Sequence, residues 1–201
     1  MGIQEKEDTV TRRGLLAQFS ALALTVMGAG AQGQQSQKPA KALKWDPKME
    51  LAIDFEINQS NEGRYHRPYV AAWLEDKDGK SVRTLSLWVQ TERRGPRWIP
   101  DLRRWYRGAQ ANMTAGGTDL VATISSATRM PGKYSLVWDG KDDKGNPVAQ
   151  GTYTFNLETA REHGPYGVMQ KEVVIGPKPF KAEVAGNAEV KGATVEYRKH
   201  K

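Results

Sequence analysis

Hydrophobic and polar residues alternate strictly along the segment MELAIDFEI, residues 49–57. Apolar side chains occupy every second position: Met49, Leu51, Ile53, Phe55 and Ile57. A β-strand points successive side chains to opposite faces, so a period of two indicates one buried face and one exposed face. The segment is therefore predicted to be a half-buried strand.

The next strand signals surround a tight turn. Two apolar runs, Tyr69–Leu74 and Val82–Val89, flank an Asp-Gly pair at positions 78–79. Asp-Gly favours the two-residue turns that connect antiparallel strands, because glycine accepts a left-handed backbone. We predict a β-hairpin here.

A second pair of alternating runs, Tyr134–Trp138 and Tyr153–Leu157, flanks a stretch rich in Gly, Asp and Pro. This pattern predicts a long hairpin. Further β-like segments are residues 118–129, 171–176 and, more weakly, 181–199.

Helical periodicity is confined to one place, Pro100–Ala109. Around it Trp98, Leu102, Trp105 and Ala109 recur at helix spacing. Short strands about ten residues apart, separated by turn residues, are typical of a β-sandwich. We therefore predict an all-β fold, an immunoglobulin-like antiparallel β-sandwich with one Arg/Trp-rich insert that carries a short helix.

The N-terminus has the features of an export signal. Arg12 and Arg13 precede an apolar run that ends in Ala29-Gly30-Ala31, an A-x-A cleavage pattern. We predict a twin-arginine-type signal peptide over residues 1–31, a flexible tether over 32–44, and a single domain over 45–201. After cleavage no membrane-spanning segment is expected, and the protein is expected to be periplasmic or secreted.

Composition and charge limit the partners and the reactive groups that the protein can have. The formal net charge of +7 favours anionic partners, although a basic surface also serves solubility alone. The chain has no cysteine, which excludes disulfides, thiolate nucleophiles and iron–sulfur clusters. The chain also has no G-x-S-x-G elbow and no phosphate-binding P-loop, so no catalytic residue is predicted and a hydrolase has no support.

The segment ERRGPRWIPDLRRWYRG, residues 92–108, concentrates six arginines among aromatic residues. Arginine grips carboxylates and phosphates with two parallel hydrogen bonds and stacks on aromatic rings. The candidate residues for binding a partner or an anionic ligand are Arg97, Trp98, Arg103, Arg104, Trp105 and Arg107. In the alternative interpretation Trp98, Leu102 and Trp105 close the end of the sandwich, and the arginines only keep the insert soluble. Export argues against nucleic acid as the partner.

A metal site would have to use histidines and carboxylates. Glu162 and His163 follow a predicted strand, and His66 is a third candidate. Adjacent strand residues point to opposite faces, so Glu162 and His163 can meet one metal only where the strand has ended. The alternative is a strand-end histidine that bonds to a neighbouring carbonyl.

Two resemblances add to this interpretation. The stretch YSLVWDGKDDKGNPVAQGTYTF, around Trp138–Phe155, resembles the immunoglobulin-like repeat of flagellar hook-capping proteins. In order along the chain, PYVAAWLED, RWIPDLRRWYR, SSATRMPGKYSLVWDG and AREHG resemble the predicted periplasmic family called domain of unknown function 2271. That second resemblance implies a secreted β-rich domain without an assigned activity. It also implies a genomic neighbourhood of flavin-transferase and PepSY-type membrane proteins.

Two hypotheses of function follow. The first is an exported, non-enzymatic binding or adaptor module whose insert engages a partner protein or an anionic cofactor, such as a flavin phosphate or a haem carboxylate. The second is a cofactor- or metal-bearing accessory of a periplasmic flavin or iron redox system, with a membrane redox protein as its partner.

The export signal gives a direct test. Replacing Arg12 and Arg13 by lysine keeps both charges but removes the twin-arginine pattern. We expect cell fractionation to find the variant in the cytoplasm and the parent protein in the periplasm. An unchanged periplasmic yield would contradict the twin-arginine prediction and leave the general secretory route.

Overall fold

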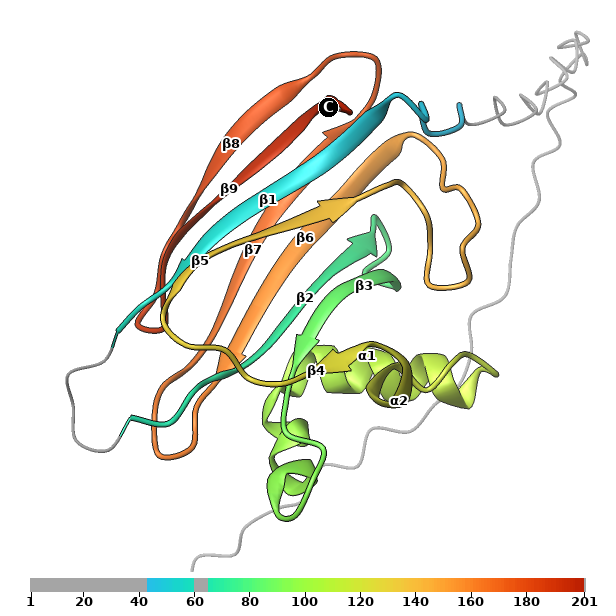
Figure 1. Ribbon diagram of the computed structural model, residues 1–201. Coiled ribbons are helices and arrows are strands. Elements are labelled where there is room, and N and C mark those ends of the chain that lie inside the picture. Colours follow the sequence, from blue (N-terminus) through green and yellow to red (C-terminus); the bar gives the residue numbers. More distant parts are fainter. Residues whose placement is uncertain (1–42, 60–64, 201) are drawn as a thin grey trace, which may run out of the picture. The chain divides into compact units, whose positions relative to one another are not determined.

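The computed structural model describes residues 43–59 and 65–200 (Figure 1). The predicted signal peptide and nearly all of the predicted tether lie outside the described residues. The last two tether residues already contact the domain: Gln150 donates its backbone N–H to the carbonyl of Leu43 at 2.6 Å, and Lys44 forms a β-bridge with Ala149. No helix within the described ranges is long and apolar enough to cross a membrane.

Two β-sheets pack face to face (Figure 1). The four-stranded sheet has the spatial order β5 (Gly132–Trp138), β1 (Met49–Ile57), β9 (Val190–Lys199), β8 (Phe180–Ala185). The five-stranded sheet has the order β4 (Ser125–Ser126), β3 (Ser81–Trp88), β2 (Tyr69–Asp76), β6 (Gly151–Ala160), β7 (Tyr166–Ile175). The predicted β-sandwich is thus confirmed. Its pairs are antiparallel except for the short parallel pair β3–β4, and an immunoglobulin-like topology stays a prediction.

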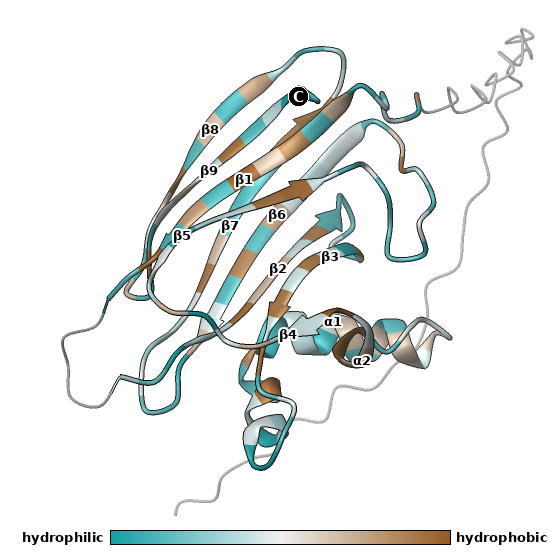
Figure 2. Ribbon diagram, viewed as in Figure 1, coloured by the Kyte–Doolittle hydropathy of each residue, from teal (hydrophilic) through white to brown (hydrophobic). Residues whose placement is uncertain are grey.

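The core between the sheets follows from the alternating pattern along the strands, visible as bands in Figure 2. All five apolar residues predicted for one face of β1 are buried, and they pack against apolar residues of both sheets. Two fully buried side chains, Trp138 and Phe155, come from different sheets. Each large apolar side chain removed from water contributes about 2 kcal/mol to folding.

The hairpin predicted at residues 78–79 is confirmed, whereas the second predicted hairpin is wrong. β2 and β3 pair antiparallel around Gly79, whose φ is +76°. In contrast β5 pairs with β1, and β6 pairs with β2 and β7, so the turn-rich stretch after Trp138 crosses from one sheet to the other. Alternation assigns each strand a buried face but does not assign its neighbour. Trp138 and Tyr153 meet across the core, with ring centroids 5.1 Å apart, instead of across a shared ladder.

A helical insert covers the outer face of the five-stranded sheet. It comprises the 3₁₀ helix η1 (Gly95–Asp101) and the helices α1 (Arg103–Thr114) and α2 (Leu120–Ile124). Together with the sheet it forms a second apolar cluster of Tyr69, Ala71, Trp73, Leu87, Val89, Ile99, Leu102, Trp105, Ala109, Leu120 and Ala160. β2 is therefore buried on both faces, which explains why its sequence is a continuous apolar run.

The helices differ from the prediction in their bounds. The predicted helix at 100–109 is confirmed, but α1 begins at Arg103 and ends at Thr114. The segment before Ser125 is helical, because Asp119 accepts hydrogen bonds from the backbone of Val121 and Ala122 and so caps α2. Of the β-like segment predicted over residues 118–129, only Ser125 and Ser126 form a strand.

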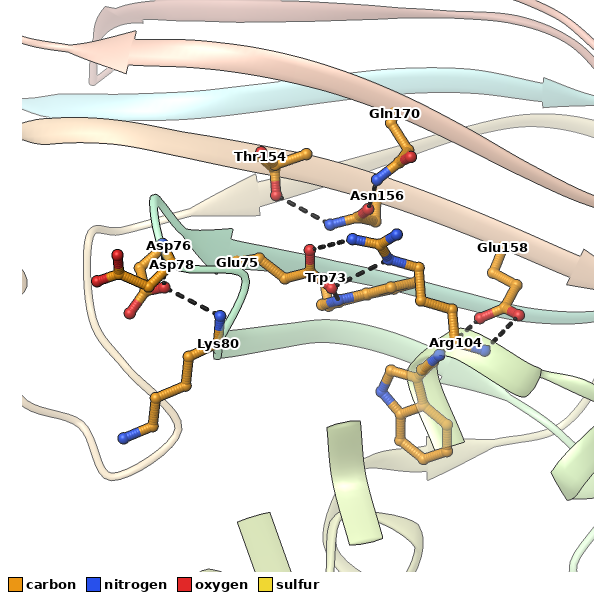
Figure 3. Close-up of polar contacts among 11 residues, drawn as sticks. Trp73, Glu75, Asp76, Asp78, Lys80, Arg104, Thr154, Asn156, Glu158 and Gln170 are labelled. Carbon is orange, nitrogen blue, oxygen red and sulfur yellow. Dashed lines mark hydrogen bonds and ion pairs between the residues drawn. The ribbon is translucent and has the colours of Figure 1, made fainter. Parts of the chain in front are cut away.

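α1 has no cap of its own, since its N-cap residue is Leu102 and its first turn contains no acid. The cap comes from β6, more than fifty residues later in the chain. Glu158 accepts the backbone N–H of Arg104 at 2.9 Å and that of Trp105 at 2.8 Å (Figure 3). The carboxylate is fully buried, and its negative charge lies at the positive end of the helix dipole. Glu158 thereby fastens the insert to the sheet.

Replacing Glu158 by alanine leaves two amides without an acceptor in the interior. We expect a loss of about 3 kcal/mol in the free energy of unfolding, measured by urea titration. The matched control is Asp119→Ala, which removes the exposed cap of α2 and is expected to cost about 1 kcal/mol. Equal losses in the two variants would contradict the anchoring role of Glu158.

Candidate ligand-binding site

Two of the predicted binding residues form part of the attachment of the insert. Trp105 is 2% exposed, and its indole Nε1 donates to the hydroxyl of Thr84 at 3.2 Å. The Arg104 guanidinium donates to Glu75 through Nε at 3.2 Å and Nη2 at 2.6 Å (Figure 3). This bidentate contact raises the pKa of Arg104. The positive charge of Arg104 is therefore paired with Glu75.

Arg103 occupies the border of the same network. Its guanidinium lies 4.6 Å from the centre of the Tyr166 ring. The Tyr166 hydroxyl donates to Glu158 Oε1 at 2.8 Å. Burial, together with the hydrogen bond and the charge of Glu158, raises the pKa of Tyr166 to about 12. Tyr166 therefore stays protonated, and keeps this hydrogen bond, over the whole physiological range.

The other three predicted residues lie at different places. Arg107 is exposed on α1. Arg97 stacks on Trp98, with its guanidinium carbon 4.5 Å from the ring centre, and both residues line a cavity. Of the six residues, the structure brings only Arg97 and Trp98 to this cavity.

The cavity has a volume of about 780 Å³ and lies beyond the C-terminal end of β3. Its walls come from residues 89–95, η1, β4 and the turn after β6. Arg93 and Arg94 line it beside Arg97, although they are not among the six predicted binding residues. Arg93 has a φ of +53°, a left-handed conformation that is uncommon outside glycine and occurs often at functional sites. Three arginines thus line one solvent-accessible space.

A smaller cavity of about 260 Å³ adjoins the first. The two share Gln90, Trp98 and Glu162, and the smaller one is also lined by His66 and Arg67. Trp98 is half-buried and contributes to both walls. The two cavities together form one site around Trp98, which we call the Trp98 site.

The predicted metal ligands His66, Glu162 and His163 lie close together at the edge of this site. β6 ends at Ala160, so the strand has ended before Glu162, as a shared site requires. The Glu162 carboxylate lies 3.4 Å from His66 Nδ1 and 3.9 Å from His163 Nε2. Within residues 43–59 and 65–200, however, no group of three or more His, Asp or Glu side chains is arranged to hold a metal ion. In the described residues Glu162 is therefore a carboxylate with two imidazole neighbours, His66 and His163.

One buried contact beneath the site had no signal in the sequence. Arg161 Nε donates to Glu189 at 2.7 Å, with side chains that are 8% and 4% exposed. The partners are 28 residues apart and follow no periodic pattern, so sequence spacing cannot pair them. Arg161 also lies 5.9 Å from the ring of Tyr65, which lines the smaller cavity. The ion pair ties the end of β6 to the turn before β9.

The fold and the site define a two-layer β-sandwich protein with a helical insert and an arginine-lined cavity. The chain belongs to the family of predicted periplasmic proteins called domain of unknown function 2271, whose model matches residues 50–192, more than two thirds of the sequence. Searches of the curated proteins and of the solved structures find no match. The resemblance of residues 138–155 to the hook-capping repeat is not confirmed.

Proposed function

We propose that this protein is an exported binding or adaptor module without a catalytic step, and that it engages an anionic ligand or an acidic partner at the Trp98 site. The proposal includes export by the twin-arginine signal around Arg12 and Arg13. Membership of a predicted periplasmic family supports the compartment. The observation that carries the binding role is the grouping of Arg93, Arg94 and Arg97 around one cavity.

The chemistry of the walls suits an anion with an apolar or planar part. Guanidinium groups bind carboxylate and phosphate oxygens with two parallel hydrogen bonds. Arg97 contacts the Trp98 ring by a cation–π interaction, so the flat indole ring lies beside the positive charges. A volume of about 780 Å³ is also in the range of small-molecule sites.

The runner-up is a cofactor-bearing accessory of a periplasmic flavin or iron redox system. It uses the same site, because a flavin phosphate or a haem carboxylate is also an anion attached to a planar ring. The contact of His66 and His163 with Glu162 favours it to a smaller degree. A visible absorption band in protein purified from the periplasm would distinguish this second function from the first.

Binding can be tested with pyrophosphate as an anionic probe and isothermal titration calorimetry as the measurement. The double variant Arg94→Ala with Arg97→Ala removes two cavity guanidiniums, and we expect its affinity to fall about tenfold or more. The matched control, Arg103→Ala with Arg107→Ala, removes two charges from α1 and should keep most of the affinity.

Thermal unfolding of the first double variant should stay near that of the parent, because both side chains are exposed. The control variant should unfold at a slightly lower temperature, because Arg103 loses its cation–π contact with Tyr166. Equal loss of affinity in the two variants would show that net charge alone attracts the probe. If the parent protein bound neither pyrophosphate nor any carboxylate-bearing probe, the proposed function would be wrong.

A further inference from the structure

The Trp98 site also carries acids, and these restrict what can bind. Glu92 and Glu162 line the larger cavity together with its three arginines. Glu162 faces both cavities, and its side chain is 36% exposed. A ligand with only negative charges would meet this carboxylate unfavourably, whereas a ligand with a separate positive group would pair with it.

Residues of an edge strand contribute to one wall of the larger cavity. Ser125 and Ser126 form β4, the edge strand of the five-stranded sheet, and both line the cavity. β4 pairs with β3 on one side, where Val89 donates its N–H to the carbonyl of Ser126 at 2.9 Å. The outer side of an edge strand presents N–H and C=O groups that complement an extended peptide. Neither a simple anion nor a nucleotide has this repeating pattern of donors and acceptors.

Resting on the proposed binding function, we infer that the ligand of the Trp98 site is a short extended peptide with free termini. Its carboxylate pairs with the guanidiniums of Arg94 and Arg97, and its backbone adds alongside β4. Its ammonium group pairs with Glu162. The opposite charges of the cavity are then matched by the two ends of one zwitterion.

Matched probes test this assignment by calorimetry on the exported protein. Trialanine carries both terminal charges, N-acetyl-trialanine carries only the carboxylate, and trialanine amide carries only the ammonium. We expect trialanine to bind best and each blocked peptide to bind about tenfold more weakly. Methylation of the central amide nitrogen should also weaken binding, because it removes a backbone donor.

Variants connect each end of the peptide to its partner residues. In Glu162→Gln the acetylated and free peptides should bind equally, and in the double variant Arg94→Ala with Arg97→Ala the amidated and free peptides should bind equally. Glu172→Gln, an exposed change on β7, is the control and should leave the ranking of the three peptides intact.

The outcomes separate this inference from the proposed function. If pyrophosphate binds and none of the peptides does, the peptide assignment is wrong and an anion site remains. If the acetylated peptide binds the parent protein as tightly as trialanine, the role of Glu162 is wrong. If neither pyrophosphate nor any peptide binds, the proposed function fails together with the inference.

Discussion

A buried carboxylate fixes the start of the helical insert's α1 against the five-stranded sheet. Glu158 lies on β6 without exposure to solvent and accepts hydrogen bonds from two backbone amides of α1 and from the hydroxyl of Tyr166. A buried charge persists only when such partners satisfy it, so the sheet, α1 and β7 must keep their relative positions. η1 precedes α1 directly, which means that the same constraint positions Arg97 and Trp98 at the cavity.

The arginines of the insert perform two different tasks. Arg104 neutralises the buried Glu75, and Arg103 covers the ring of Tyr166, so both stabilise the position of α1. The arginines before α1 lie outside this network and line the Trp98 site. The segment therefore divides into a part that packs on the sheet, with Leu102 and Trp105 buried there, and a part that lines the Trp98 site, for which binding is our proposal. The division follows from where the helix begins, because Arg104 on α1 contacts Glu75 of the sheet whereas Arg94 and Arg97, before α1, line the cavity.

The sequence predicted those features that depend on local patterns. Strict alternation identified the buried face of β1, and the Asp-Gly pair identified the turn between β2 and β3. Features that depend on distant residues could not be predicted, because nothing in a local pattern encodes a partner. The pairing of β5 with β1 is one example, and the capping of α1 by Glu158 is another. For the site, composition singled out the segment 92–108, but only the fold separates Arg94 and Arg97, which line the cavity, from Arg104 and Trp105, which contact the sheet.

Hydrogen exchange at the start of α1 tests most directly whether the insert is fastened by Glu158. We expect the amides of Arg104 and Trp105 to exchange only through global unfolding, with protection equal to that of the central strands. The amides of Val121 and Ala122, capped by the exposed Asp119, should exchange much faster and provide the internal reference. Rapid exchange of Arg104 and Trp105, at the rate of that reference, would contradict the account.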